Sequence, residues 1–378
     1  MSLRTYARVD LDAVRDNVGA LVERAHGAQV MAVVKADGYG HGLLPCARAA
    51  LAGGASWLGV AFLEEALAVR AAGVDAPVLA WLFSPQEDLS AAVAADIDLG
   101  IYDEQELQAA VTAATATGRT ARLQLKVDTG LSRGGATPDQ WPDLCAAAAR
   151  AEAGGAVRVT GVWSHFANAD GGADHPVNAL QTKVFREALE VAAAAGLTPQ
   201  VRHLANSAAT LTAPDTYFDL VRPGLSVYGL SPVPQWGEPS SYGLRPAMSL
   251  HSTVALAKRV RAGAGVSYAH RYLTERDVTL TLVPLGYADG VPRAGTNLLE
   301  VQHRGVRRRV AGTVCMDQFM LDVGDDPAEA GDEVLLFGPG DQGEPTAQDW
   351  ATALHTIDYE IVTRIGARVP RVHVGGQA

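Results

Sequence analysis

The segment Val30-Met-Ala-Val-Val-Lys-Ala-Asp-Gly-Tyr-Gly-His-Gly42 joins a β-strand pattern to a glycine-rich turn. Apart from Lys35, residues Val30–Ala36 are apolar or small, which is typical of a strand that is buried in a parallel sheet. The glycines that follow end the strand and allow the backbone to approach another group closely. We therefore expect a buried strand that carries Lys35 at its C-terminal end.

The same alternation of β-rich and helical stretches continues up to about residue 235. The further strand candidates are Trp57–Ala61, Val78–Leu82, Leu99–Tyr102, Leu123–Asp128, Val159–His165, Val201–Ala205 and Asp219–Arg222. Eight strands that alternate with helices over about 230 residues are typical of a parallel (β/α)₈ barrel of the TIM type. A doubly wound open sheet is the alternative, but no Gly-x-Gly-x-x-Gly motif follows the first strand.

The pattern changes after the Pro-, Gly- and Ser-rich stretch Ser231–Ser241, which is typical of a linker or a long surface loop. Beyond it we expect helices near 346–354 and 359–365 and a series of short strands. The strand candidates are Ser249–Lys258, Val278–Pro284, Arg309–Val314, Met320–Val323 and Glu333–Phe337. The predicted fold is thus α/β, with a barrel over residues 1–235 and a mostly β domain over residues 236–378. A strand at about 5–9 exceeds the eight of the barrel and is expected to pair with the second domain.

Composition excludes several classes of function. The formal net charge of -11 would repel a nucleic-acid backbone. No apolar run reaches the roughly 18 residues of a membrane span, and the N-terminus lacks a signal-peptide pattern. The three cysteines are widely spaced and include no Cys-x-x-Cys pair, which argues against a disulfide framework or a zinc site. We expect a cytoplasmic protein that binds neither nucleic acid nor membrane, and no metal.

Polar side chains follow the ends of five of the eight predicted strands. They belong to Lys35, Lys126, Asp128, His165, Asn206, Ser207 and Arg222. In a (β/α)₈ barrel these ends meet on one face, where active sites are built. A desolvated lysine has a lowered pKa and can form a Schiff base with an aldehyde. Asn206-Ser and Gly224-Leu-Ser are suited to binding phosphate, although Asn-Ser is also an ordinary helix cap.

Nine motifs in order give the chain a family resemblance. They are Val34-Lys-Ala-Asp-Gly-Tyr-Gly-His-Gly, Lys126-Val-Asp-Thr-Gly-Leu-Ser-Arg-Gly-Gly, Ser164-His-Phe-Ala-Asn-Ala-Asp, His203-Leu-Ala-Asn-Ser-Ala-Ala, Val221-Arg-Pro-Gly-Leu-Ser-Val-Tyr-Gly, Val266-Ser-Tyr, Gly286-Tyr-Ala-Asp-Gly, Gly312-Thr-Val-Cys-Met-Asp-Gln and Tyr359-Glu-Ile-Val-Thr-Arg-Ile. With these motifs, essentially the whole chain resembles the alanine racemases. Members of that family depend on pyridoxal 5'-phosphate (PLP) and have a barrel domain followed by a β domain.

The resemblance implies a catalytic pair and a homodimer with shared active sites. Lys35 would form the Schiff base with PLP and act as one base, and Tyr268 would reach in from the second subunit as the other. Arg222, supported by His203, would face the pyridine nitrogen of the cofactor. His165 would lie near Tyr268 or Arg222. The implied activity is the interconversion of L-alanine and D-alanine, which supplies D-alanine for peptidoglycan.

The resemblance also implies binding residues. The cofactor would be held by Tyr39, His165, Asn206, Ser207, Arg222, Gly224, Leu225 and Tyr359. The substrate would meet Arg133, Tyr268, Tyr287, Met316 and Asp317. Lys126 matches a lysine that is carbamylated in many members of the family, where the carbamate orients the residue corresponding to Arg133. Asp358 departs from the family pattern, because relatives often have a small residue before the tyrosine.

These implied roles make chemical sense. Racemisation removes the Cα proton on one face and returns a proton on the other, so two opposed bases are sufficient. The pKa of a tyrosine is near 10 and would be lowered by Arg222 or by a protonated His165. A guanidinium beside the pyridine nitrogen donates hydrogen bonds but does not transfer a proton, so the nitrogen would stay unprotonated. Side reactions such as transamination would then be limited.

Three alternatives stay open on the sequence alone. A basic-amino-acid decarboxylase shares the PLP barrel, although Val266-Ser-Tyr argues against it. A racemase that prefers another amino acid, such as serine, is separated poorly from an alanine racemase by sequence. A non-enzymatic PLP-homeostasis protein would be a single short barrel without the residues that follow the linker.

Overall fold

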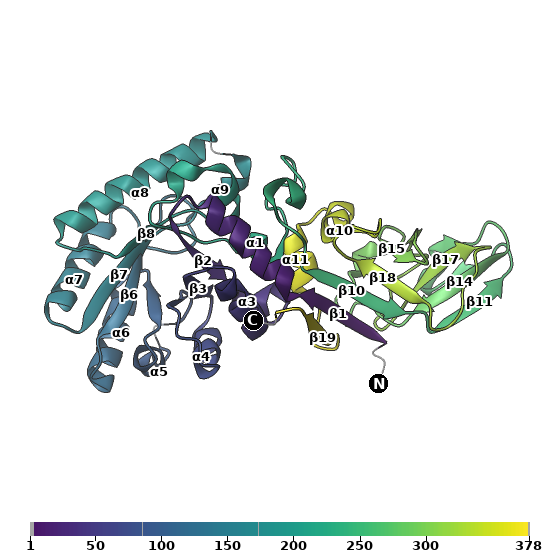
Figure 1. Ribbon diagram of the computed structural model, residues 1–378, viewed down its shortest axis with the longest axis horizontal. Coiled ribbons are helices and arrows are strands. Elements are labelled where there is room, and N and C mark those ends of the chain that lie inside the picture. The colour runs from purple at the N-terminus through teal and green to yellow at the C-terminus, as the bar shows by residue number, and fades with distance from the viewer. Residues whose placement is uncertain (1–3, 85, 173, 377–378) are drawn as a thin grey trace. The chain divides into compact units, whose positions relative to one another are not determined.

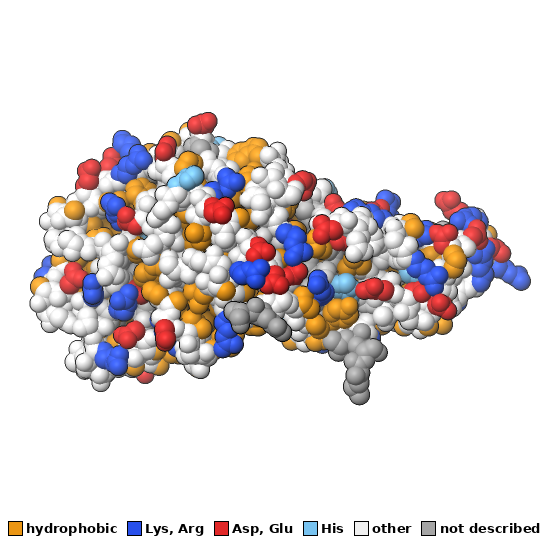
Figure 2. Space-filling view, viewed as in Figure 1, with side chains coloured by type: hydrophobic (Ala, Val, Ile, Leu, Met, Phe, Trp, Pro, Cys, Tyr) orange, Lys and Arg blue, Asp and Glu red, His pale blue; other side chains and the backbone are white. Residues whose placement is uncertain are grey.

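The computed structural model describes residues 4–84, 86–172 and 174–376, which form two compact units. The barrel unit comprises Ala13–Gly38 and Leu43–Leu244. The β unit comprises the chain up to Asp12, the short segment Tyr39–Gly42, and the chain from Arg245 onward. Acidic and basic side chains are interspersed on the face drawn in Figure 2.

Eight parallel strands form the barrel unit, in the order β8-β7-β6-β5-β4-β3-β2-β9. They are β2 (Gln29–Val33), β3 (Trp57–Val60), β4 (Val78–Ala80), β5 (Asp98–Ile101), β6 (Ala121–Lys126), β7 (Val157–Trp163), β8 (Val201–His203) and β9 (Leu220–Val221). Between β8 and β9 the ring closes through two backbone hydrogen bonds, from the Asp219 N–H to the Arg202 carbonyl and from the Arg222 N–H to the Ala205 carbonyl. The predicted (β/α)₈ barrel is confirmed.

Helices cover the outside of the barrel, and Figure 1 shows α6, α7 and α8 outside strands β6, β7 and β8. They are α1 (Leu11–Arg24), α3 (Leu43–Ala52), α4 (Leu63–Ala71), α5 (Ser90–Ala94), α6 (Glu104–Thr117), α7 (Trp141–Ala153), α8 (Pro176–Ala194) and α9 (Ser207–Thr212). Helix α6 illustrates the local signals. The Asp103 side chain caps its start by accepting the Glu106 N–H, and Gly118 ends it in the left-handed conformation.

The inside of the barrel is packed with side chains from several strands. Met31, Trp57, Leu79, Val201 and Leu220 form one buried cluster. Burying apolar side chains of this size contributes about 1.5–3 kcal/mol each, so the barrel is a filled core rather than a pore. Reactive groups are therefore confined to the ends of the strands.

The β unit takes up the chain from Arg245, nine residues after the predicted domain boundary. Its six-stranded sheet has the order β16-β15-β18-β10-β1-β19, beside a three-stranded sheet β11-β14-β17 and a ribbon β12-β13. The elements are β1 (Thr5–Asp10), β10 (Met248–Thr253), β11 (Leu256–Val260), β12 (Gly265–Val266), β13 (Tyr272–Leu273), β14 (Val278–Val283), β15 (Glu300–His303), β16 (Val306–Arg309), β17 (Phe319–Gly324), β18 (Glu333–Phe337), β19 (Arg371–Val374), α10 (Ala347–Leu354) and α11 (Asp358–Thr363). Strand β1 pairs antiparallel with β10 and parallel with β19.

Two expected strands differ from the structure. The run Ser249–Lys258 is not one strand but two, β10 and β11, which belong to different sheets. The run Arg309–Val314 is also wrong, because β16 ends at Arg309. Gly312 has a φ of +82°, and a Cβ there would lie 2.5 Å from the Val266 carbonyl oxygen, so this segment turns against the chain before Tyr268. No described helix is both long enough and apolar enough to cross a bilayer.

Candidate active site

Lys35 stands at the start of a tight turn rather than at the end of the strand. Strand β2 ends at Val33, and the next element, α2 (Lys35–Tyr39), contains non-helical residues. Ala36 has a φ of +54°, a conformation that a residue with a side chain adopts only at a cost. The turn is held because the Ala36 N–H donates to Glu65 Oε1 at 2.6 Å. Glu65 of α4 thus fixes the backbone next to Lys35.

The surroundings of Lys35 favour its neutral amine. Burial lowers the pKa of Lys35, the charge of Arg133 lowers it further, and Glu65 acts in the opposite direction. The Nζ atom lies 5.9 Å from the centroid of the Trp81 ring. A lower pKa leaves more of the lysine as the neutral amine, which is the form that attacks an aldehyde.

A buried guanidinium lies at the centre of the same barrel end. Nη1 of Arg222 donates to Nδ1 of His203 at 2.9 Å, and Nη2 donates to the Ser164 carbonyl at 2.7 Å. Nη2 also lies 3.3 Å from Nδ1 of His165. Burial lowers the pKa of Arg222 to about 9, which still leaves the group charged at neutral pH. Since arginine has only donors, both histidines accept from it.

The histidines beside Arg222 are neutral. Burial is the largest cause that lowers the pKa of both His165 and His203 well below the ordinary value, and the charge of Arg222 adds to it. The sequence left two sources of positive charge open, Arg222 and a protonated His165, and the lowered pKa of His165 favours Arg222. The charges of Arg133, Lys126 and Lys35 also oppose protonation of His165.

Lys126 ends strand β6 on the same side of the barrel. Its Nζ donates to the Gly134 carbonyl at 2.7 Å and lies 5.0 Å from the Trp163 ring centroid. Burial lowers the pKa of Lys126 to about 8, and the charges of Arg133 and Arg222 also lower it. Trp163 supports both cations, since the Arg222 guanidinium carbon lies 5.1 Å from the same ring.

The loop that carries Arg133 is organised by a single carboxylate. Oδ1 of Asp128 accepts the backbone N–H groups of Gly130, Leu131 and Ser132 at 2.9, 3.0 and 3.1 Å. Bonds of this kind to an ionised carboxylate are among the stronger ones in proteins. Asp128 was expected at this strand end from the sequence. In the structure its side chain holds the loop before Arg133 in shape.

The residues expected to bind phosphate come from two adjacent segments. Oγ of Ser207 accepts the N–H of Gly224 at 2.8 Å and lies 3.4 Å from the Ser226 nitrogen. The Asn206 side chain instead accepts the Ala209 N–H as the cap of α9. Ser207 and the Gly224-Leu-Ser segment are thus brought together, whereas the Asn206 side chain serves the helix.

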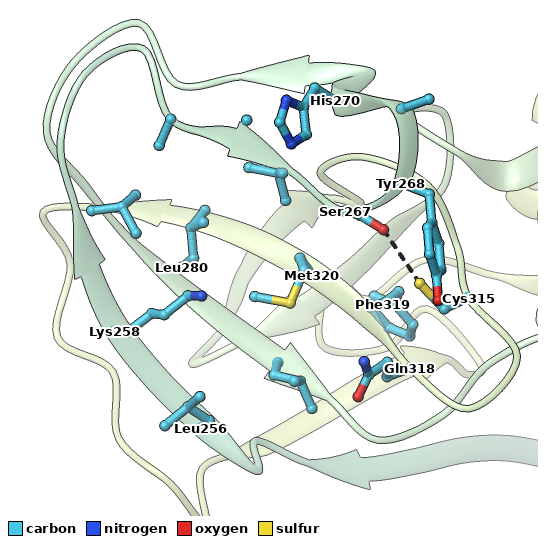
Figure 3. Close-up of a pocket in the computed structure, with 16 residues that line it drawn as sticks. Leu256, Lys258, Ser267, Tyr268, His270, Leu280, Cys315, Gln318, Phe319 and Met320 are labelled. Carbon is cyan, nitrogen blue, oxygen red and sulfur yellow. Dashed lines mark hydrogen bonds between the residues drawn. The ribbon is translucent and has the colours of Figure 1, made fainter.

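Tyr268 projects from the β unit, where its backbone is fixed and its ring is 73% exposed. The Tyr268 carbonyl accepts the Thr313 hydroxyl at 2.9 Å, and Ser267 Oγ donates to the Thr313 carbonyl at 2.7 Å. Figure 3 shows the Tyr268 ring beside Cys315 at one end of a cavity of about 570 Å³. The exposed Tyr268 side chain is therefore available to contact a group outside the β unit.

The three other substrate candidates of the β unit lie on two adjoining segments. The Tyr287 N–H donates to the Cys315 carbonyl at 3.0 Å, which places Tyr287 beside Met316 and Asp317. Arg368 joins the same segments, because it forms ion pairs with Asp289 at 3.1 Å and Asp317 at 2.8 Å. Sequence analysis missed Arg368, and no local signal distinguishes it from other surface arginines.

Tyr39 and Tyr359 also lie together in the β unit, with ring centroids 6.2 Å apart. Burial raises the pKa of Tyr39, so its phenol stays protonated. Asp358, before Tyr359, is buried at the start of α11. Burial raises the pKa of Asp358 to about 7, while hydrogen bonds from its own N–H and that of Tyr359 act in the opposite direction.

Asp358→Asn is expected to stabilise the protein at alkaline pH. Because the pKa is raised on folding, the native state holds a proton that the unfolded chain releases from about pH 4. Stability is therefore lost as pH rises from about 4 to about 7. The melting temperature of the variant should match that of the wild type near pH 4 and exceed it by about 2–5 °C at pH 8. A constant difference across this range would contradict the argument, and the exposed Asp341→Asn serves as the control.

Comparisons with known proteins identify the family. A family model described as the alanine racemase N-terminal domain matches residues 9–232, and one described as the C-terminal domain matches residues 247–373. The chain is 65% identical to the alanine racemase of Frankia casuarinae over 98% of this chain and 97% of the relative. It is 60% identical to that of Thermobifida fusca over 99% of both chains.

Solved structures give the same result. The alanine racemase from D-cycloserine producing Streptomyces lavendulae superposes with a TM-score of 0.98 at 54% identity, covering 100% of this chain and 98% of that one. The alanine racemase from Streptomyces coelicolor A3(2) gives a TM-score of 0.96 at 55% identity, covering 98% of both chains. Two family models cover both units, and relatives above 30% identity span nearly the whole chain, so the chain belongs to the alanine racemase family.

Proposed function

We propose that this chain interconverts L-alanine and D-alanine with PLP bound at the end of the barrel that carries Lys35. One observation carries the proposal. Lys35, with its lowered pKa, and the buried cation Arg222 lie at the same end of the barrel. Family membership supplies the reaction class, an isomerisation by an amino-acid racemase. The proposed biological role is the supply of D-alanine for peptidoglycan in the cytoplasm.

The residues present fit the cofactor. Lys35 provides a primary amine with a lowered pKa for the aldehyde, and Ser207 with Gly224 and Leu225 provides a hydroxyl and backbone groups for the phosphate. When bound, PLP supplies a conjugated ring that stabilises the negative charge left at Cα after proton loss. Arg222 would face the pyridine nitrogen, and as a pure donor it would leave that nitrogen unprotonated. Phosphate contacts by Asn206, Tyr39 and Tyr359 stay predictions.

Two bases on opposite faces of the substrate would move the proton. Nζ of Lys35 would take or return the Cα proton on one face, and Oη of Tyr268 from a second copy of the chain would do so on the other. His165 supports this arrangement as a neutral group. Because its Nδ1 accepts from Arg222, the ring proton is on Nε2, which would donate a hydrogen bond to the Tyr268 oxygen of the second copy.

The substrate carboxylate would be bound by Arg133, whose loop Asp128 holds in shape. On the β unit, Tyr287, Met316 and Asp317 would line the substrate from the second copy, as the resemblance predicts. Tyr287 and Met316 are 42% and 53% exposed, which leaves them available for such contacts. A homodimer with shared sites follows from this assignment.

Lys126 is proposed to react with CO₂ and become a carbamate. Only a neutral amine reacts in this way, and the pKa of Lys126 is lowered to about 8 by burial, Arg133 and Arg222. The amine nitrogen bonds to the CO₂ carbon and releases a proton to water, and the two neighbouring arginines would stabilise the resulting anion.

A carbamate at Lys126 predicts a ¹³C signal when the protein is equilibrated with labelled bicarbonate. The signal should grow as pH rises through about 8, and Lys126→Ala should remove it. We expect the variant to lose about tenfold in kcat and to recover part of the loss in acetate, which can replace the missing anion. A signal that survives the substitution would assign the carbamate to another amine.

A chiral assay tests the proposed function. Alanine, serine and lysine are each incubated with the protein, with and without added PLP, and the enantiomers are separated. The proposal predicts that alanine is racemised fastest and that removal of PLP abolishes the activity. Faster racemisation of serine would assign a different substrate, and release of CO₂ from lysine would identify a decarboxylase instead.

A further inference from the structure

A buried glutamine lies behind the Arg222–His203 pair. Gln124 belongs to β6, two residues before Lys126, and is fully buried inside the barrel. Its Oε1 lies 2.7 Å from Nε2 of His203, whose other nitrogen, Nδ1, accepts from Arg222 at 2.9 Å. The three side chains form one line of hydrogen bonds from the centre of the barrel towards its active end.

The chemistry of this line fixes where the proton of His203 resides. A guanidinium only donates, so Nδ1 of His203 must be unprotonated. The single ring proton is then on Nε2, which needs an acceptor because it is buried. Oε1 of Gln124 is that acceptor. Burial lowers the pKa of His203 well below its usual value, so a second proton is absent at neutral pH.

The packing around Gln124 holds its amide in this orientation. A Cβ at Gly161 would lie 2.9 Å from Oε1, so the neighbouring strand leaves room for the amide only because it has glycine there. The Trp163 indole stacks on His203, with ring centroids 5.8 Å apart, and donates to the backbone carbonyl of Gln124 at 3.3 Å. On β5, burial raises the pKa of Asp98 and the nearby Gln124 amide acts in the opposite direction, although Nε2 of Gln124 has no hydrogen-bond partner among the described residues.

We propose that Gln124 is a positioning residue that fixes the Nε2–H tautomer of His203 and thereby the orientation of the Arg222 guanidinium. Arg222 is held by four acceptors, namely His203 Nδ1, His165 Nδ1, and the carbonyls of Ser164 and Leu204. In the other tautomer, an N–H of His203 would point at an N–H of Arg222. The effect of Gln124 on catalysis rests on the proposed function of Arg222. The tautomer of His203 does not depend on that function.

The direct test is ¹⁵N NMR of the histidine ring nitrogens in protein labelled with ¹⁵N-histidine, with His203→Asn used to assign the signal. The proposal predicts that His203 has a protonated Nε2 and an unprotonated Nδ1 throughout pH 6–9. A protonated Nδ1, or an imidazolium in this range, would overturn it. The measurement needs no cofactor turnover, so it stands whether or not the protein racemises alanine.

Two substitutions separate positioning from packing. Gln124→Met keeps the volume but removes the acceptor, and we expect kcat for alanine to fall about tenfold with KM nearly unchanged, together with a shift of the His203 signals. Gln124→Glu, which can share a proton with Asp98, keeps an acceptor and should retain the Nε2–H signal and most of the activity. The exposed Gln108→Met is the matched control.

The outcomes distinguish this inference from the proposed function. If the wild type fails to racemise alanine but has the expected tautomer, the proposed function fails and the positioning of Arg222 stands. If the wild type is active and Gln124→Met leaves both kcat and the His203 signals unchanged, the role of Gln124 is refuted. Should Gln124→Met fail to fold, a protonated Nδ1 of His203 in the wild type would still overturn the proposal, and Gln124→Glu must keep the Nε2–H signal for it to stand.

Discussion

Lys35→Ala should abolish racemisation, lowering the rate by more than about 10³-fold, and should remove the visible absorbance of covalently attached PLP. The variant keeps the fold of the barrel but lacks both the amine that attaches to the cofactor and the base on one face of the substrate. The turn around residue 35 is held by the bond from the Ala36 N–H to the Glu65 side chain, which does not involve the Lys35 side chain, so the turn should survive the substitution.

The control for this experiment is Lys183→Ala. Lys183 is an exposed lysine of α8 that forms a surface ion pair with Glu187, so its loss should leave absorbance and rate unchanged. A rate near that of the wild type with the absorbance retained would refute the Schiff-base and base roles together. A rate near that of the wild type with the absorbance lost would refute only the role of Lys35 as a base.

Tyr268→Phe should lower the rate of racemisation by about 10²–10⁴-fold, the range typical of removing a general acid or base. The equilibrium constant between enantiomers is one, so kcat/KM must fall equally in both directions. The asymmetry is instead expected in solvent exchange. In D₂O, one enantiomer should still incorporate deuterium at Cα through Lys35, while the other should lose most of its exchange.

Tyr272→Phe is the matched control, because Tyr272 lies in the same unit and its hydroxyl donates to Asp322 at 2.7 Å. That substitution removes one hydrogen bond and should cost about 1 kcal/mol of stability without affecting exchange. Equal and small losses of exchange for both enantiomers of alanine in Tyr268→Phe would count against a two-base mechanism.

Most of the fold could be predicted because it follows from local patterns. Apolar runs of strand length, separated by helical stretches, placed all eight barrel strands, and the barrel topology then gathered Lys35, Lys126 and Arg222 at one end. The break between β10 and β11 was missed, since the sequence there continues as β-type residues while the chain changes sheets.

The residues that support the site could not be predicted, because their partners are distant in sequence. Glu65 bonds to Ala36 across 29 residues, and Gln124 bonds to His203 across 79. The burial of individual side chains also could not be predicted from the sequence. The lowered pKa of His165 depends on its position beside Arg222, which no periodicity reveals, and it favours Arg222 over a protonated His165 as the source of positive charge.

Subunit complementation tests the central claim, that Lys35 and Tyr268 act together in sites shared by two copies of the chain. Lys35→Ala and Tyr268→Phe are purified separately, mixed in equal amounts under conditions that allow subunits to exchange, and assayed for alanine racemisation. Half of the dimers should then be mixed, and each of these has one site with both bases intact. The account predicts recovery of about one quarter of the wild-type activity. No activity above that of the two separate variants, in a mixture whose heterodimers are verified by mass, would contradict it.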